Sequence, residues 1–476
     1  MKTTGTRVAL AALGILCLSA FTAQATWTYD TGANTISDGN WTLNVKAGVK
    51  DTANLQISGY VSGGNGPLDF TTFAADTGSG KVIAEIAHGL GLCQYGLTEF
   101  IAPDMTYIAG TGIAYYGNGQ TNNLSLTRIV LNENVTFGNE RVFDRLTKLV
   151  SLTPTCFKKA DKITNYAFYQ CSSLEGDFEF PEATSAGTQA FDGCARISSF
   201  TAPKLTTINN LAFRFCSSLT NVEVSADLSQ MDNNAFGDCT SLVSFSPRII
   251  LMETIGAAFQ GCTSLGGRFV LPNLVKGSQT FSGCSSLEGV EAPNLGIADS
   301  SFMYNCSSVK GVLSFSVLSN VNSTAFYGMS GITDVILPRV RVIGNQAFNF
   351  CTSLTNMVFG KSLKTLYGYA IYNTASPLSI WFAGGDVPRW AGNANDPAIK
   401  TADGSRARLY VYGGSDNLSW QDRLYETRTP ENVAKWKESA SYPGRKTFGV
   451  LKDVPNQSVY HWVVDPRTLG LSIIVR

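Results

Sequence analysis

The amino-acid sequence predicts an α/β solenoid with a parallel β-sheet on one face and short helical turns on the other. The first observation is a phenylalanine that recurs every 22 or 23 residues and is replaced only by Met303 and Ile371. The second is a cysteine three residues later, and the third is an aliphatic residue six residues later, in nearly every repeat. A period in the low twenties that is held this long is typical of stacked coils, each contacting only its neighbours.

The repeated positions form a ladder of side chains that we expect to line the interior of the coils. The aromatic position is occupied by Phe168, Phe191, Phe213, Phe236, Phe259, Phe281, Met303, Phe326, Phe348 and Ile371. The position three residues later is occupied by Cys171, Cys194, Cys216, Cys239, Cys262, Cys284, Cys306, Met329 and Cys351. Equivalent side chains of stacked coils point the same way, so the ladder is predicted to be the structural core.

The elements of one coil can be derived from residues 219–242. Residues 219–224 alternate apolar and polar, which predicts a short strand with one buried face. After a turn, Asn233 is suited to capping a short helix, and Phe236 and Cys239 lie at i and i+3 on one face of that helical turn. Such a coil has one apolar side that it cannot bury alone. Stacking buries it, with the strands pairing into a parallel sheet.

Two motifs within the coil resemble a known family. The strand motif Ile197-x-x-Phe200-x-Ala202-Pro203 resembles the leucine-rich repeat. The larger unit Ala-Phe-x-x-Cys-Ser-Ser-Leu resembles that of BspA-like bacterial surface proteins, and it occurs nearly intact at 167–174, 212–219, 235–242, 258–265 and 347–354. The resemblance covers residues 166–382 and implies an exported bacterial surface protein with a role in adhesion and protein binding. It implies no shared catalytic residue.

The chain is predicted to have four parts. Residues 1–25 form a signal peptide, residues 26–85 a small β region or N-terminal cap, residues 86–382 the leucine-rich repeat solenoid and residues 383–476 a C-terminal α+β cap. The strand and turn signals of residues 26–85 also fit a small binding module, and this alternative stays open.

The first 25 residues have the features of a leader. Basic residues precede an apolar run at 8–21, and an A-x-A cleavage site ends at Ala25, so we expect a mature chain that starts at Thr26. This predicts a secreted or cell-surface protein without membrane insertion after the leader is removed. Loss of Lys2 and Arg7 leaves 34 basic and 36 acidic residues. Such a nearly neutral chain is not expected to bind nucleic acid.

The cysteines are expected to be core thiols. Ten remain after leader removal, an even number that in an exported protein suggests disulfides. Eight of them share one phase of the repeat, however, and parallel Cα–Cβ bonds fit the disulfide torsion poorly. Met329 at the same phase also points to apolar packing. Cys93 and Cys156 lie outside the ladder, and a bridge between them stays open.

The sequence contains no recognisable catalytic or metal-binding motif. Its two histidines, His88 and His461, lie far apart and have no metal-ligand spacing around them. We therefore expect no cofactor, no metal and no enzymatic activity.

One strand residue per coil is predicted to face outward and to form a row across the sheet. The row consists of Glu179, Thr201, Glu223, Ser246, Val270, Glu291, Ser314, Ile336, Val358 and Trp381. It changes along the solenoid from acidic and hydroxylic to apolar. An exposed apolar stripe often marks an interface, although a C-terminal segment that covers it would explain it equally well.

Two functions are consistent with these features. The first is a non-enzymatic exported protein that binds an extracellular protein or glycan through the sheet face. Its candidate binding residues are Glu179, Glu223, Val270, Glu291, Ile336, Val358 and Trp381. The second is a secreted carbohydrate-active enzyme or glycan-binding protein whose active part lies in residues 26–85 or 383–476. In that case tryptophans outside the repeats would stack on sugars, namely Trp27, Trp41, Trp390, Trp420, Trp436 and Trp462.

Overall fold

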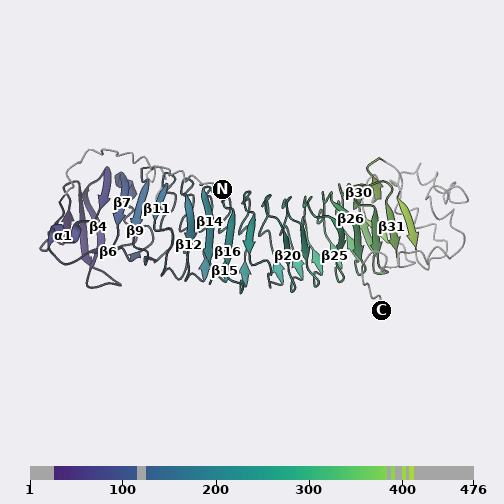
Figure 1. The fold of residues 1–476 in the computed structure, drawn as a ribbon, viewed down its shortest axis with the longest axis horizontal. Coiled ribbons are helices and arrows are strands. Elements are labelled where there is room, and N and C mark those ends of the chain that lie inside the picture. Colours follow the sequence, from purple (N-terminus) through teal and green to yellow (C-terminus); the bar gives the residue numbers. More distant parts are fainter. Residues whose placement is uncertain (1–25, 115–124, 383–387, 392–398, 404–406, 412–476) are drawn as a thin grey trace, which may run out of the picture.

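The protein is an elongated parallel β-solenoid of about 13 turns with almost no helix (Figure 1). The computed structural model describes residues 26–114, 125–382, 388–391, 399–403 and 407–411. Figure 1 shows the coils stacked along the long axis, from the end that carries α1 to the end that carries β31. The predicted solenoid with a parallel sheet is confirmed.

Each coil contributes a longer strand, a shorter strand and a turn, which form its three sides. The turn carries the phenylalanine and the cysteine of the ladder, and we call it the Phe–Cys turn. In one coil, β14 (Ile197–Ala202) is followed by β15 (Thr207–Ile208) and then by the turn at 209–216. β14 pairs in parallel with β16 (Asn221–Val224) of the next coil, and β15 pairs with β17 (Gln230–Met231). The alternating strand pattern buries every second side chain.

The longer strands form the long-strand face, which is divided into four sheets. The first contains β5 (Gly66–Asp69), β7 (Leu97–Ala102), β9 (Arg128–Leu131) and β11 (Ser151–Thr153). The second contains β12 (Gly176–Glu179), β14, β16 and β18 (Ser244–Ser246), and the third β20 (Arg268–Val270) and β22 (Gly289–Glu291). The fourth contains β24 (Gly311–Ser314), β26 (Ile332–Leu337), β28 (Asn356–Phe359), β31 (Ser379–Phe382) and β34 (Arg408–Val411).

The shorter strands form the short-strand face. Its first part is β6 (Ile83–Ile86), β8 (Tyr107–Ile108) and β10 (Thr136–Phe137), followed by β13 (Ser185–Ala186), β15 and β17. Its second part is one sheet of β19 (Thr254–Ile255), β21 (Lys276–Gly277), β23 (Ile297–Ala298), β25 (Asn320–Val321), β27 (Val342–Ile343), β29 (Thr365–Tyr367) and β32 (Arg389–Ala391). A further pair, β30 (Ile371–Thr374) and β33 (Ile399–Thr401), continues the turn side.

An antiparallel meander begins the described chain. Its strands are β1 (Thr28–Asp30), β2 (Thr35–Ser37), β3 (Trp41–Ala47) and β4 (Leu55–Gly63). β4 then pairs in parallel with β6, so that the meander and the solenoid share one sheet. The division predicted between residues 85 and 86 falls within β6.

A buried carboxylate ties this meander to the solenoid. Glu85 is fully buried and accepts hydrogen bonds from the backbone amides of Val49, Lys50 and Asp51 at 2.6–2.9 Å, and from the side chain of Gln56 at 3.0 Å. These donors satisfy the charge and fix the β3–β4 connection against the strand that carries Glu85.

The prediction of helical turns is wrong. Within the described residues the helical segments are α1 (Phe73–Thr77) and η1 (Leu92–Tyr95), and both precede the clear repeats. In the Phe–Cys turn, the amide of Phe236 donates to the carbonyl of Ala258 and that of Asp238 to Gln260, both in the next coil. Asn234 and Asp238 have positive φ angles of 51° and 57°. A helix would direct its amides along its own axis, whereas these turns use alternate amides to bind the neighbouring coil.

The predicted C-terminal α+β cap is not supported. Most of residues 383–476 lie outside the described residues. The short stretches that are described form β32, β33 and β34, which pair in parallel with β29, β30 and β31. Over these stretches the chain extends the sheets of the solenoid.

The core is a stack of phenylalanine rings along the solenoid axis. The ring centroids of Phe168 and Phe191 are 4.7 Å apart, those of Phe191 and Phe213 are 5.2 Å apart and those of Phe213 and Phe236 are 5.1 Å apart. The interplanar angles of these three pairs are 9°, 8° and 6°. All phenylalanines of the ladder are fully buried. Ring stacking stabilises the fold in addition to the stabilisation that comes from removing the area of each ring from water.

The ring stack is interrupted at Met303. The preceding residue, Phe302, packs edge-on between Phe281 and Phe326, with interplanar angles of 71° and 84°. A Cβ atom at Gly277 would overlap the Phe302 ring, so the glycine provides the space that this ring occupies. The coil keeps an aromatic core but loses the parallel stack.

The ring stack makes a direct prediction for stability. Replacing Phe236 with Ala should lower the free energy of unfolding by about 3–5 kcal/mol, because the stacked coils cannot collapse into the empty site. Urea unfolding followed by circular dichroism would measure the loss. Phe215→Asn is the control, because Phe215 lies in an adjacent turn but is 46% exposed. It should change the free energy by less than about 1 kcal/mol. Equal losses in both variants would contradict the ladder as the core.

Candidate binding surface

The outward row predicted from the sequence lies in strand register on the long-strand face. Glu179 pairs with Thr201, Thr201 with Glu223, and Glu223 with Ser246 across β12, β14, β16 and β18. Val270 pairs with Glu291 between β20 and β22. Ser314, Ile336, Val358 and Trp381 follow one another across β24, β26, β28 and β31. Each sheet thus presents its part of the row as a line of adjacent side chains.

The acidic part of the row is open to solvent. Glu179, Glu223, Ser246 and Glu291 are exposed, and Thr201 is half-buried. The carboxylates of Glu223 and Glu291 make no hydrogen bond or ion pair within the part of the chain that the structure describes. They are therefore available to an external donor.

The apolar part of the row is less accessible. Ile336 is only 2% exposed, while Val358 and Trp381 are half-buried. The strand that carries Trp381, β31, is also not at the edge of its sheet, because β34 pairs with it in parallel. These positions do not form the open apolar stripe that the sequence suggested.

A second polar line runs beside the acidic row. Asp177, Ser199, Asn221 and Ser244 are in register on the same strands. The carboxylate of Asp177 accepts hydrogen bonds from the hydroxyls of Ser199 at 2.6 Å and Ser198 at 2.8 Å. These bonds lower the pKa of Asp177 below its usual range. These residues lie two positions before the residues of the acidic row, so the alternation of the strands turns them outward as well. The sequence analysis considered only one outward residue per strand and therefore missed this line.

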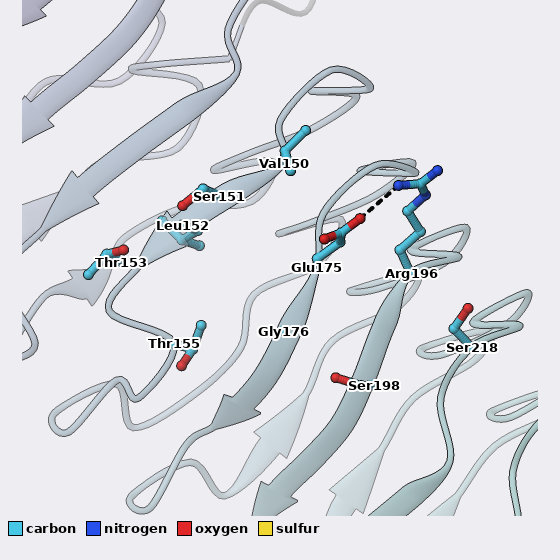
Figure 2. A pocket seen from close by; sticks show the side chains of 10 residues that line it. All are labelled: Val150, Ser151, Leu152, Thr153, Thr155, Glu175, Gly176, Arg196, Ser198 and Ser218. Atoms are coloured by element: carbon cyan, nitrogen blue, oxygen red, sulfur yellow. Dashed lines mark hydrogen bonds and ion pairs between the residues drawn. The ribbon is translucent and has the colours of Figure 1, made fainter. Parts of the chain in front are cut away.

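A groove of about 760 Å³ opens between β11 and β12. Figure 2 shows it lined by hydroxyl side chains, with the ion pair between Glu175 and Arg196 beside it. The Glu175 and Arg196 side chains are 2.7 Å apart and are 53% and 60% exposed. The groove lies where β11 and β12 belong to different sheets. The two coils are linked there by an isolated bridge between Cys156 and Glu179 and by the hydrogen bond from the amide of Glu175 to the carbonyl of Val150 at 3.2 Å. This break in the repeat has no periodic signal in the sequence.

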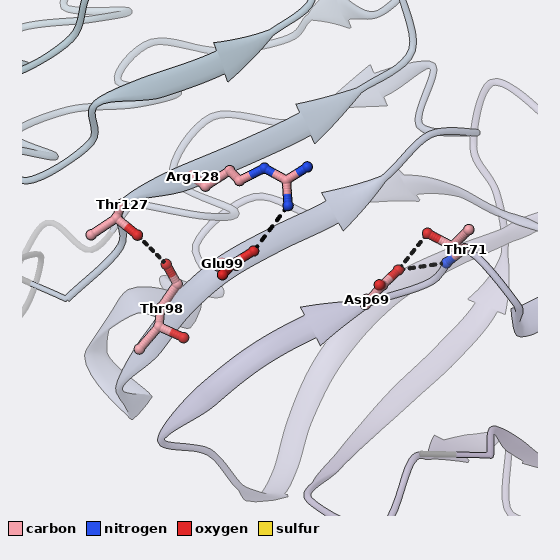
Figure 3. Close-up of polar contacts among 6 residues, drawn as sticks. All are labelled: Asp69, Thr71, Thr98, Glu99, Thr127 and Arg128. Atoms are coloured by element: carbon pink, nitrogen blue, oxygen red, sulfur yellow. Dashed lines mark hydrogen bonds and ion pairs between the residues drawn. The ribbon is translucent and has the colours of Figure 1, made fainter. Parts of the chain in front are cut away.

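The polar character continues toward the N-terminus. Figure 3 shows Arg128 on β9 bound to Glu99 on β7, at 3.1 Å, and the hydroxyl of Thr127 donating to the carbonyl of Thr98, at 3.2 Å. Further along, the Asp69 carboxylate accepts from the amide of Thr71 at 2.8 Å. The long-strand face thus carries hydrogen-bond donors and acceptors from β5 to β22.

Several residues considered for chemistry lie apart from this face. Trp27 and Trp41 are 2% and 0% exposed, and their indole N–H groups donate to the carbonyls of Asp69 and Pro67. They pack inside and are not positioned to stack on a sugar. His88 is exposed, whereas His461 lies outside the described residues. Among the residues that the structure describes, no three histidine, cysteine, aspartate or glutamate side chains group closely enough to hold a metal ion.

The ladder cysteines are free and buried, and each donates a hydrogen bond. The Sγ atom of Cys239 donates to the carbonyl of Phe213 in the preceding coil at 3.0 Å. The same bond recurs at 2.9–3.3 Å for Cys171, Cys194, Cys216, Cys262, Cys284, Cys306 and Cys351. Met329 occupies the equivalent position opposite Met303 and has no proton to donate. Cys93 and Cys156 are also free, so they form no bridge.

A comparison with protein families shows to which family the chain belongs. Residues 110–176, 153–266 and 257–377 match the BspA type leucine rich repeat region, in six copies, and together cover more than half of the sequence. The chain belongs to the BspA type leucine-rich repeat family. The resemblance inferred from the Ala-Phe-x-x-Cys-Ser-Ser-Leu unit is thereby confirmed. Among curated proteins, none matches this member of the family.

Several solved structures of bacterial proteins are similar to this BspA type protein. It is 20% identical to a leucine rich cell surface protein from Faecalibacterium prausnitzii, and the match covers 68% of this chain and 94% of that one with a TM-score of 0.42. It is 21% identical to a leucine-rich repeat protein from Bacteroides ovatus, with 76% and 90% covered and a TM-score of 0.45. The pneumococcal vaccine antigen PcpA is 13% identical, with 82% and 96% covered and a TM-score of 0.32.

The described ranges contain no helix with the length and apolarity that are needed to cross a membrane.

The thiol ladder predicts the pattern of cysteine reactivity. Burial raises the pKa of seven of the eight ladder thiols, that of Cys351 to about 12, so these seven stay protonated as well as inaccessible when the pH rises from 7 to 9. Cys239 differs, because burial is outweighed by its hydrogen bonds with Cys216 and Cys262, which lower its pKa, but it is fully buried and therefore also inaccessible. Titration of the native protein with a thiol-specific disulfide reagent should label the half-buried Cys156 alone. Denaturation without reductant should release the remaining thiols.

Cys156→Ser provides the control for this titration, because it should abolish the labelling of the native protein and leave the denatured count lower by one. Rapid reaction of several thiols in the folded variant, or a denatured count that rises only after reduction, would contradict a ladder of buried free cysteines.

Proposed function

We propose that this protein is an exported, non-enzymatic surface protein that binds an extracellular protein through the polar part of the long-strand face. The observation that carries the proposal is the outward-facing row Glu179–Thr201–Glu223–Ser246, which is exposed except for the half-buried Thr201 and is held in register by four paired strands. A partner lying across this row would contact several coils at once, because adjacent strands are about 4.8 Å apart.

The charge of the row indicates the chemistry of the partner. Glu179, Glu223 and Glu291 are exposed carboxylates, and the neighbouring hydroxyls and amides donate and accept hydrogen bonds. Such a surface favours lysine and arginine side chains together with backbone amides, which are the groups that a polypeptide loop offers. The groove between β11 and β12 borders the same face and provides a depression for a projecting side chain.

Localisation at the cell surface is part of the proposal. It is supported by the leader-like residues 1–25 and by membership of the BspA type family. The related protein from Faecalibacterium prausnitzii is described as a cell surface protein.

Export can be tested by expressing the full chain in a bacterial host with a general secretion pathway. The secreted fraction should contain a protein that begins at Thr26, because signal peptidase cleaves after the A-x-A site. N-terminal sequencing or intact mass would identify this end. Retention of the full-length chain in the cytoplasm would argue against the proposal.

The binding face can be tested by charge reversal. An array of purified extracellular proteins and glycans would first identify a protein ligand for the mature chain. Glu179→Lys combined with Glu223→Lys should weaken its binding about tenfold or more at low salt, because two attractive contacts become repulsive. The difference from the parent should shrink as the salt concentration rises, because exposed charges are screened.

Glu253→Lys is the matched control, because Glu253 is also an exposed glutamate but immediately precedes β19 on the short-strand side. It should leave the affinity within about twofold of the parent, since screening weakens the effect of a distant surface charge. Equal affinity of the double variant and the parent would exclude the long-strand face as the binding site.

A further inference from the structure

The C-terminal coils of the solenoid carry the opposite net charge to the coils before them. Residues 166–299 contain 13 acidic and six basic residues, whereas residues 300–382 contain one acidic and five basic residues. The acidic residue of the second segment is Asp334, whose carboxylate accepts hydrogen bonds from the side chains of Thr333 and Asn356. The near neutrality of the whole chain therefore conceals a separation of charge along the solenoid.

Four of the five basic residues lie together at one corner of two adjacent coils. Arg339 and Arg341 lie in the connection from β26 to β27, and Lys361 and Lys364 lie in the connection from β28 to β29. All four are exposed, and we call them the basic edge. The corner separates the long-strand face from the short-strand face, so the basic edge is distinct from the acidic row.

The backbone places the two connections directly against each other. A Cβ atom at Gly360 would overlap the carbonyl oxygen of Pro338. Further along, the amide of Lys364 donates to the carbonyl of Arg341 at 2.8 Å. Neighbouring coils are about 4.8 Å apart, so the fold holds like charges next to each other. Such charges repel each other, and a bound anion would remove the repulsion.

Nearer the N-terminus the same corner is built from opposite charges. Glu182 and Lys204 each follow a proline at the end of a long strand, as Arg339 does, and their side chains form an ion pair at 2.6 Å. Lys158 and Glu133 form a further ion pair between adjacent coils at 2.8 Å. Stacked coils can therefore neutralise the charges of this corner, and the basic edge departs from that arrangement.

Three cations of the basic edge are available to an external ligand. The side chains of Arg339, Arg341 and Lys361 make no ion pair with any residue that the structure describes. They lie on two adjacent coils, so a ligand with several negative charges could contact more than one of them at a time.

The composition of the edge argues against a protein or a nucleic acid as its occupant. Residues 338–341 and 360–364 contain no aromatic side chain, and Val340 and Leu363, the aliphatic residues among the cations, are buried. Protein interfaces are anchored by aromatic and apolar side chains in a desolvated centre. Single-stranded nucleic acids are held by aromatic rings that stack on the bases. The edge offers charge without either kind of anchor.

A flat anionic membrane also fits this corner poorly. The preceding coils present Glu182, Asp227 and Glu253 as exposed acidic residues in the connections of the same corner. A membrane lying along the solenoid would meet these carboxylates as well as the cations, and the attraction and the repulsion would oppose each other.

We propose that the basic edge binds a flexible linear polyanion that carries a sulfate, phosphate or carboxylate group on each unit. Arginine and lysine bind such groups through charge-assisted hydrogen bonds. A flexible chain can follow the two coils of the edge and stay away from the acidic coils beside them, and its repeated charges contact several cations at once. Binding releases condensed counterions, so the affinity depends strongly on salt.

The decisive variant combines Arg339→Asn with Lys361→Asn. Asparagine already stands at this corner in two other coils, as Asn273 and Asn294, where its side-chain amide donates to a carbonyl of the preceding coil. The variant therefore removes two charges and keeps a side chain that the local backbone accommodates.

Lys158→Asn combined with Lys204→Asn is the matched control. It removes the same charge from exposed lysines in the connections of the same corner, but these lysines are already bound by Glu133 and Glu182. It should leave the affinity for a polyanion within about twofold of the parent, since screening weakens the effect of distant surface charges.

The experiment is titration calorimetry of the mature chain with heparin, polyphosphate and alginate, which distinguish sulfate, phosphate and carboxylate as the anion. At low salt at least one of the three should bind the parent, and the Arg339→Asn, Lys361→Asn variant should bind it about tenfold more weakly. The difference should shrink as the salt concentration rises. Binding of a protein ligand to the long-strand face should be unchanged in this variant, so the two sites are tested separately.

Binding of none of the three polymers by the parent would overturn the proposal. So would equal affinity of the parent and the edge variant, with melting curves that show both folded, or an equal loss in the control variant. Single-stranded DNA, polyglutamate and vesicles that contain phosphatidylglycerol are the competing probes. Tighter binding to one of them than to every polymer would assign the edge to a nucleic acid, an acidic polypeptide or a membrane instead.

Discussion

The structure depends on the hydrogen bonds that the Phe–Cys turns make between coils. In the turn at 209–216 the amide of Phe213 donates to Ala235 at 2.7 Å, and that of Phe215 donates to Gly237 at 2.8 Å. These bonds set the vertical spacing of the turns, and the spacing in turn brings the phenylalanine rings into stacking contact. The thiol of Cys239 in that next turn adds a third bond, which it donates back to the carbonyl of Phe213. The two strand ladders then follow in register on the other sides of the coil.

The periodic features of this fold could be predicted from the sequence because each is repeated. The phase of Phe236 and Cys239 identifies the inside of the coil, and the alternation around Glu223 identifies the outside of the strand. The conformation of the turn was predicted wrongly because a spacing of i and i+3 suits a helix and a hydrogen-bonded turn alike. The distinguishing signal lies two residues after the aromatic position. Glycine, asparagine or aspartate stands there in most coils, at Gly193, Asp238, Gly261, Gly283, Asn305, Gly328 and Asn373, with positive φ in each.

Features that occur once could not be predicted in this way. The groove between β11 and β12 lies at a break in strand pairing, and the burial of Ile336 depends on its surroundings in the folded chain. The difference between the acidic middle coils and the basic C-terminal coils is visible in the sequence. Only the stacking of the coils shows that these residues form continuous surfaces. Arg341 and Lys364, for example, are 23 positions apart in the sequence but are neighbours in the fold. One scaffold thus presents two surfaces of opposite charge in different places.

The interruption at Met303 affects how strongly neighbouring coils of the solenoid are held together at that position. The stability of a linear array is a sum over the interfaces between neighbours. The interface between the coils of Met303 and Met329 lacks the thiol bond, worth about 1 kcal/mol, and it also lacks the parallel ring stack found between Phe326 and Phe348 in the following coils. On the outside of the same interface, however, Tyr304 and Tyr327 lie face to face. They form a contact on the outside of this interface. Separating the two coils at this point therefore requires the two tyrosine rings to move apart.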